Sequence, residues 1–209
     1  MQIIAVSQRV DTDPRTGERR DGLDQAWARF LAACGCLAWP VPNTSRLVEP
    51  ILDHALVAGV LLTGGNDLVV CGGRAVERDR TDYLLLNAAR RRRLPVLGVC
   101  RGMQVIQHAF GAALGRVPGH VAAEQVIAID GRRERVNSYH RFGTIATVPD
   151  LEVWARADDG MVKAVRHRFE PITGIMWHPE RLQPFADRDV ALFQEVFGGG
   201  LPDSKWRRA

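Results

Sequence analysis

The residues of this 209-residue chain best suited to covalent chemistry surround Cys100, in the segment Gly98-Val99-Cys100-Arg101-Gly102. A buried strand is predicted over 95–99 and a helix from Arg101 to about Leu114. A G-x-nucleophile-x-G pattern between a strand and a helix is typical of a sharp turn that exposes the nucleophile, because glycines permit close backbone approach. The unpaired N–H groups of a helix start also favour a thiolate. Taken alone, the pattern fits a buried structural cysteine equally well.

A base for such a thiol follows another predicted strand, 174–177, in Trp177-His178-Pro179-Glu180. A cysteine nucleophile needs a base, and the base needs an orienting partner on its second ring nitrogen. Pro179 fixes its own φ near −65° and so favours a turn in which the Glu180 carboxylate receives the imidazole N–H. The alternative is that His178 only caps the strand and that Glu180 lies in solvent.

A third element, Thr63-Gly64-Gly65-Asn66-Asp67, follows the strand predicted over 59–62. Its glycines expose backbone N–H groups, which an oxyanion hole requires together with the N–H after the nucleophile. All three elements lie at the carboxyl ends of predicted parallel strands, where open α/β sheets place their sites. We therefore expect Cys100 and His178 to meet beside a glycine-lined pocket.

Strands and helices alternate in the first half of the chain, and short strands dominate the second. Predicted strands are 3–6, 37–41, 59–62, 95–99, 125–129, 135–139, 144–148, 153–157, 162–166 and 174–177; predicted helices are 23–34, 45–56 with Ser45 as its cap, 78–93, 101–114 and 187–197. Residues 11–20 are predicted to be a loop. The fold class is α/β, with a mostly parallel layered sheet flanked by helices and a β-rich C-terminal half. We expect one domain over 1–200 and a loose tail over 201–209.

The composition, 46% hydrophobic and 25% charged, is that of a folded protein. The net charge of +4 is mild, and its densest run, Arg90 to Arg93, ends a predicted helix without interleaved aromatics, so we expect no nucleic-acid partner. Four cysteines (Cys34, Cys36, Cys71 and Cys100) form no CxxC pair, so no metal is expected. No apolar run approaches the ~18 residues that span a bilayer. These features predict a cytoplasmic protein with reduced thiols and no membrane partner.

With Cys100, His178 and Glu180 in its triad order, the sequence resembles the class I glutamine amidotransferase family, which has a flavodoxin-like layered fold. The motifs at 97–104, 136–140 and 177–180 resemble those of the gamma-glutamyl hydrolase branch, and the resemblance covers Ile3 to Phe197. Within that branch the chain is short and lacks the usual D-P-x-x-Y-G segment after the glycine pair. Segments 6–9, 65–68 and 137–140 and the Trp27 helix look closer to the gamma-glutamyl-CDP-amidate hydrolases of bacterial capsule phosphoramidate biosynthesis.

The resemblance implies a mechanism without a cofactor. Cys100 attacks a glutamyl γ-carbonyl, the N–H groups of Gly65 and Arg101 bind the oxyanion, and His178 protonates the departing nitrogen before water hydrolyses the thioester. The glutamyl α-amino and α-carboxylate groups are expected to be held by Gln104, Asn137, Ser138 and Tyr139. His140 is either a second active-site histidine or a structural one. A diphosphate leaving group is a possible ligand of Arg9, Arg19 and Arg20, although exposed loop arginines usually have no such role.

The favoured function at this point is hydrolysis of gamma-glutamyl-CDP-amidate to glutamate and cytidine diphosphoramidate. Two alternatives use the same chemistry: hydrolysis of gamma-glutamyl-gamma-aminobutyrate, and a glutaminase subunit that delivers ammonia to a synthetase. No synthetase domain is attached, so that partner is not required, and a homodimer is left open. A non-enzymatic alternative makes Cys100 a redox-sensing thiol, but it gives His178 and Glu180 no role.

Overall fold

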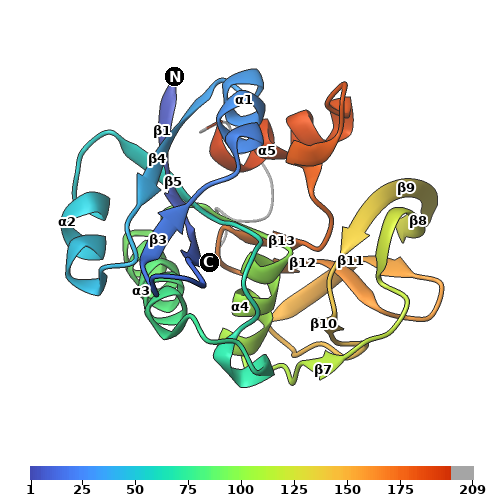
Figure 1. Cartoon of the computed structure of the whole chain (residues 1–209). Helices are drawn as coiled ribbons and strands as arrows, with labels where there is room; N and C mark the ends of the chain where they lie inside the picture. The colour runs from blue at the N-terminus through green and yellow to red at the C-terminus, as the bar shows by residue number, and fades with distance from the viewer. Residues whose placement is uncertain (199–209) are drawn as a thin grey trace.

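The computed structural model describes residues 1–198, which form one nine-stranded sheet with helices on both of its faces (Figure 1). The sheet order is β4 (Cys36–Val41), β1 (Gln2–Ser7), β5 (Val57–Leu62), β6 (Val96–Val99), β13 (Ile172–Ile175), β12 (Val162–His167), β11 (Leu151–Ala157), β8 (Val121–Ile129) and β9 (Arg132–Tyr139). The first five strands are parallel to one another, and the last four pairings are antiparallel. This confirms the predicted α/β class.

Helices cover the parallel part of the sheet. They are α1 (Gln25–Ala33), α2 (Val48–Leu52), α3 (Val76–Arg92), α4 (Arg101–Ala109) and α5 (Asp187–Phe197). On one face α1 and α5 join through Phe30 and Phe193, whose rings are 4.7 Å apart, and Phe197 lies over Gly59 of β5. On the other face Met103 and Ile106 of α4 lie over Gly174 and Gly98, and α3 packs against α4. Both faces are therefore buried, which explains why β6 is apolar throughout.

Smaller elements connect this framework. They are the antiparallel pair β2 (Arg9–Thr12) and β3 (Arg19–Gly22), the pair β7 (Gly115–Arg116) and β10 (Phe142–Gly143), and three 3-10 turns, η1 (Ser45–Leu47), η2 (Val69–Cys71) and η3 (Pro179–Arg181). The prediction of a loop over 11–20 was thus wrong at both ends, because β2 and β3 pair around a turn in which the Asp13 carboxylate accepts the Arg15 N–H at 2.8 Å.

Two predicted helices are shorter in the structure, and one predicted strand is absent. The chain over 45–56 forms η1 and then α2, which ends at Leu52, and Ser45 is not a cap; Leu56 is 61% exposed and has no core to pack on. Helix α4 ends at Ala109 rather than Leu114, because Gly111 turns the chain with a φ of +92°. Residues 144–148 form no strand, since the Thr144 hydroxyl binds the N–H of Ala146 locally.

The strands that end at the two reactive residues are neighbours in the sheet. β6 leads into Cys100, β13 leads toward His178, and the Cys100 N–H donates to the Ile175 carbonyl at 2.8 Å. The chain between α4 and β13 is an excursion that forms β7 to β12 (Figure 1). Within residues 1–198 no helix is long and apolar enough to cross a membrane. The predicted loose tail, 201–209, lies outside the described residues.

Candidate active site

The turn at Cys100 holds the sulfur at the start of α4 in a conformation that non-glycine residues rarely adopt. Its φ is +53° and its ψ −104°. The two flanking glycines make the turn sterically feasible. A methyl group on Gly98 would come within 2.5 Å of the Gly102 carbonyl carbon, and one on Gly102 would overlap the Leu62 carbonyl oxygen. The G-x-C-x-G spacing therefore reflects the close fit of a helix start between the ends of β5 and β6.

A thiol, an imidazole and a carboxylate form one buried chain of contacts. The Cys100 thiol is hydrogen-bonded to the His178 ring, and His178 Nδ1 lies 2.8 Å from Glu180 Oε1. Burial would lower the pKa of His178, but the Cys100 sulfur and the Glu180 carboxylate outweigh it and raise the pKa to about 9. An imidazole next to a sulfur and oriented by a carboxylate is the arrangement that activates a cysteine for attack on a carbonyl.

The backbone of His178 is fixed by Asn137, which lies near the end of β9. The Asn137 side-chain oxygen accepts the His178 N–H at 2.7 Å, and its amide nitrogen donates to the His178 carbonyl at 2.7 Å. Both ends of the Asn137 amide are thus engaged by His178, and the residue does not line the cleft beside Cys100. Through these two hydrogen bonds to the His178 backbone, Asn137 holds the imidazole in position.

Gly64 supports the other side of the same ring. A Cβ atom at Gly64 would lie 2.6 Å from Cε1 of His178, so an alanine would push the imidazole away from the sulfur. We expect Gly64→Ala to lower kcat about 100-fold with little change in KM, since a displacement of about 1 Å costs that much. Steady-state kinetics on a gamma-glutamyl substrate measures kcat and KM separately. The matched control is Gly115→Ala, where a Cβ meets nothing within 4 Å. Equal kinetics for the two variants would contradict the steric explanation.

The loop that carries Gly65 is held by a buried arginine that sequence reasoning missed. Arg78 donates to the carbonyls of Thr63 and Gly64 at 2.9 and 2.7 Å, and to the Asn66 side chain at 3.1 Å. Burial, and next the charge of Arg101, lowers the pKa of Arg78 to about 9, while Asp82 acts in the opposite direction. One guanidinium therefore fixes the position of the glycine pair beside Cys100.

Asp82 is shared by two buried arginines. It pairs with the Arg101 side chain and lies 3.7 Å from Arg78 Nε, and all three side chains are at most 1% exposed. We expect Asp82→Asn to lower the free energy of unfolding by about 3–5 kcal/mol, because it leaves buried cations short of countercharge. Chemical denaturation measures this.

The control for that change is Asp53→Asn. Asp53 pairs with Arg92 but is 65% exposed, and such a pair contributes about 0–1 kcal/mol. A similar loss of unfolding free energy in both variants would show that the buried network stabilises the protein no more than an exposed ion pair does.

A cleft of about 330 Å³ opens beside the sulfur. Its lining residues are Gly65, Asn66, Asp67, Cys100, Arg101, Gln104, Val121, Tyr139, His140 and Arg141. The structure thus brings together the two predicted oxyanion residues, the nucleophile and three of the predicted substrate residues. Gln104 donates through Nε2 to the Phe142 carbonyl at 2.8 Å, which anchors its amide at the cleft wall.

Other predicted site residues are not among those that line the cleft. The Ser138 hydroxyl is buried and bonds the His120 carbonyl at 2.8 Å. Arg19 pairs with Glu77 and Arg20 with Glu18 at 2.5 Å. Arg9 pairs with Asp11 at 3.0 Å, and its side chain lies beside Gly65, where its Cβ is 2.9 Å from the position of a Cβ on that glycine. None of these residues lines the cleft.

His140 belongs to a buried network around Lys163, a second feature that the sequence did not reveal. Lys163 Nζ lies 2.7 Å from His140 Nε2 and 3.0 Å from the Ser138 hydroxyl, and His140 Nδ1 lies 2.9 Å from the Phe142 carbonyl. Burial, followed by the Lys163 charge, lowers the pKa of His140 to about 3, so the ring is neutral. Burial also lowers the pKa of Lys163 to about 8, against the pull of Asp159 and the Cys100 sulfur.

Comparison with known proteins identifies relatives of this fold and site. The family model of the class I glutamine amidotransferases matches residues 20–195. The gamma-glutamyl-CDP-amidate hydrolase of Campylobacter jejuni is 29% identical over 181 residues, which cover 85% of this chain and 90% of that protein. The glutamine-hydrolysing GMP synthase subunit of Methanocaldococcus jannaschii is 32% identical over 162 residues, covering 73% and 79% of the two chains.

A solved structure has the same fold. It comes from Thermoplasma acidophilum, is provisionally described as a GMP synthase subunit, and superposes with a TM-score of 0.71 over 95% of this chain and 93% of its own. Its sequence identity is 20%, so it supports the architecture alone. The layered sheet described above is therefore a known arrangement.

Proposed function

Because the chain belongs to the class I glutamine amidotransferase family, we propose that it is a cysteine hydrolase that cleaves gamma-glutamyl amide bonds through a glutamyl thioester. The observation that carries this proposal is the contact chain Cys100–His178–Glu180 at the wall of an open cleft. A redox-sensing thiol would need neither the carboxylate behind His178 nor the glycines around the sulfur. We therefore assign these three residues as a catalytic triad.

In the first half-reaction the Cys100 thiolate attacks the γ-carbonyl carbon and forms a C–S bond. The carbonyl electron pair moves onto oxygen, where the N–H groups of Gly65 and of Arg101 stabilise it; the latter is the first residue of α4, whose opening N–H groups have no partner within the helix. When the C–N bond breaks, the imidazolium of His178 gives its proton to the departing nitrogen. The product is a glutamyl thioester and a free amine or amidate.

In the second half-reaction water replaces the amine. His178, now neutral, removes a proton from the water as it attacks the thioester carbonyl, and collapse of the second tetrahedral intermediate breaks the C–S bond. Glutamate leaves, and the thiolate–imidazolium pair is restored. One ring nitrogen of His178 gives a proton to the departing amine and takes one from water, and the other proton of that water leaves with the product carboxyl group, so no cofactor is needed.

The glutamyl group is proposed to lie against Gln104 and Tyr139. Gln104 projects from the second turn of α4 into the cleft, and its anchored amide leaves the side-chain oxygen for an α-ammonium group. Asp67, another cleft residue, adds a carboxylate of the right charge for the same group. The preferred substrate is gamma-glutamyl-CDP-amidate, by similarity to the Campylobacter jejuni hydrolase.

A glutaminase subunit is the second candidate, because the GMP synthase subunit of Methanocaldococcus jannaschii is 32% identical. Such a protein would release ammonia from glutamine for a synthetase on another chain. The discriminating experiment compares kcat/KM of the isolated chain for glutamine, gamma-glutamyl-gamma-aminobutyrate and gamma-glutamyl-CDP-amidate. Turnover of the amidate without a partner supports the hydrolase. If glutamine is the only substrate turned over, and an added synthetase accelerates that turnover, the glutaminase function replaces the hydrolase function.

A further inference from the structure

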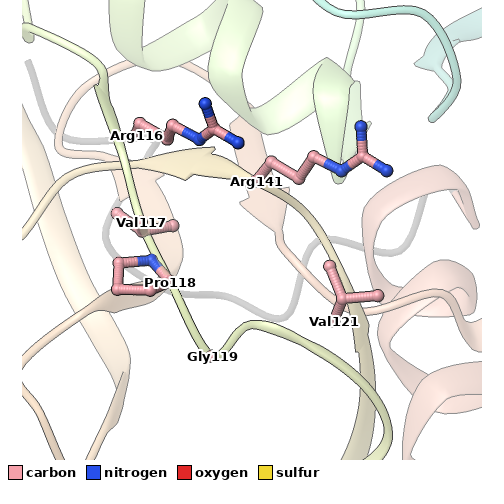
Figure 2. Close-up of a pocket in the computed structure, with 6 residues that line it drawn as sticks. All are labelled: Arg116, Val117, Pro118, Gly119, Val121 and Arg141. Carbon is pink, nitrogen blue, oxygen red and sulfur yellow. The ribbon is translucent and has the colours of Figure 1, made fainter.

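A second pocket adjoins the cleft beside Cys100, and we call it the arginine pocket. It has a volume of about 400 Å³ and is lined by Arg116, Val117, Pro118, Gly119, Val121 and Arg141 (Figure 2). Val121 and Arg141 also line the cleft, so the two spaces are neighbours that share these residues. Figure 2 shows both arginine side chains extended along the same side of the pocket, with the guanidinium groups at their free ends. The arginine pocket therefore lies next to the cleft that holds Cys100.

The arginine pocket has an uncompensated positive charge. Within residues 1–198 neither Arg116 nor Arg141 pairs with a carboxylate, and the pocket has no acidic lining residue. Other arginines of the same β-rich excursion do have partners: Arg133 pairs with Asp158 at 3.0 Å and Arg135 with Glu124 at 2.8 Å. Two unpaired guanidinium groups beside an apolar floor of valine and proline form a site for an anion with an attached organic group.

The backbone holds the two arginines at a fixed spacing. Arg116 belongs to β7, where it pairs with Phe142 of β10, and the Val117 N–H donates to the Arg141 carbonyl at 2.8 Å. Phe142 is also the residue whose carbonyl receives Gln104. The backbone that carries Arg141 is therefore tied to the cleft wall, and binding an anion need only order two side chains.

We infer that the arginine pocket binds the leaving group, and that this group carries a diphosphate. The inference rests on the proposed function, because it takes the scissile bond to lie at Cys100. Guanidinium groups bind phosphate oxygens bidentately, and two of them match two linked phosphates better than a single carboxylate. Ammonia released from glutamine carries no phosphate or carboxylate, so it offers the two guanidinium groups nothing to bind. This inference assigns the diphosphate to Arg116 and Arg141, whereas the sequence suggested Arg9, Arg19 and Arg20.

The test compares three substrates: gamma-glutamyl-CDP-amidate, gamma-glutamyl-gamma-aminobutyrate and a gamma-glutamyl anilide, whose leaving group is uncharged. For Arg116→Gln and Arg141→Gln we expect the ratio of kcat/KM for the amidate to that for the anilide to fall about tenfold each, and about 100-fold in the double variant. Arg141→Lys should fall between wild type and glutamine, since lysine keeps the charge but not the bidentate contact. The control, Arg132→Gln, removes an exposed arginine at the far end of β9 and should leave the ratio unchanged.

A binding measurement separates this inference from the proposed function. CDP is titrated calorimetrically into wild type and into the double variant, which requires no catalysis. Tighter binding to wild type by tenfold or more supports the arginine pocket even if no gamma-glutamyl compound is cleaved. A ratio that falls only for the aminobutyrate substrate would overturn the diphosphate in favour of a carboxylate. Equal CDP binding by the two proteins, or no binding to either, would overturn the inference outright.

Discussion

Replacing Cys100 by alanine should abolish gamma-glutamyl hydrolysis, with kcat falling by roughly 10⁵- to 10⁶-fold. Loss of the sulfur removes the only protein atom in the proposed mechanism that bonds to the substrate, and the remaining oxyanion donors supply only a small part of the rate enhancement. Glutamate release measured over hours, with circular dichroism to verify the fold, gives the result. Activity within tenfold of wild type would rule out the thioester mechanism.

An electrophilic glutamine analogue should modify the same residue and no other cysteine. Cys34 and Cys36 are buried, and burial raises the pKa of Cys34 to about 12 and that of Cys36 above its usual range. Burial likewise raises the pKa of Cys71, so all three are protonated at neutral pH. Mass spectrometry should find a single adduct at Cys100, which Cys71→Ser retains and Cys100→Ala loses. An adduct at another cysteine in the alanine variant would show that the reagent does not report the active site.

The second large effect is expected at Glu180. Glu180→Gln should lower kcat roughly 10³- to 10⁴-fold, because an amide neither fixes the tautomer of His178 nor stabilises its charged form. The control is Glu170→Gln, which breaks the more exposed pair with Arg90 at 2.6 Å and should leave kcat within twofold or so. A similar loss of kcat in both variants would contradict the assignment of Glu180 as the residue that orients His178.

The pH profile of Glu180→Gln should shift in a defined direction. The pKa of His178 is about 9, so the imidazolium that faces the sulfur persists at neutral pH and is lost as the pH rises through 9. Activity of the wild type should therefore hold to about that pH and then decline. Since Glu180 helps to raise the pKa, its replacement should move the alkaline decline to lower pH. A shift to higher pH would contradict the assignment of Glu180 as the partner of His178.

The features of this site that could be predicted from the sequence are those determined by residues close together in the chain. The glycines at 98 and 102 indicated the sharp turn, and the close contacts of α4 with β5 and β6 are their reason. His178 and Glu180 were expected to interact, and they are two residues apart and hydrogen-bonded at 2.8 Å. The alternating pattern of the first half likewise predicted the parallel sheet, because buried strands between helices have few other arrangements.

The features that escaped prediction depend on contacts between distant parts of the chain. Arg78 reaches a loop 15 residues away, and Asn137 binds the backbone of a residue 41 positions along the chain. Lys163 lies between apolar residues of β12, and its partners are 25 and 23 residues upstream. Nothing in the local sequence of these segments indicates such contacts, since each is created only when the tertiary fold brings distant segments together.

Because β6 and β13 are neighbours in the sheet, the residues proposed to cleave the bond and those proposed to recognise the leaving group lie in different parts of the chain. Cys100 and His178 are each anchored on one of these two strands, while Arg116 and Arg141 belong to the long segment inserted between them. Within that segment Asn137 binds the backbone of His178, so an exchange of the segment has to keep this residue. Grafting the 115–143 region between homologues should accordingly exchange their preferred leaving groups while each recipient retains its own hydrolytic apparatus.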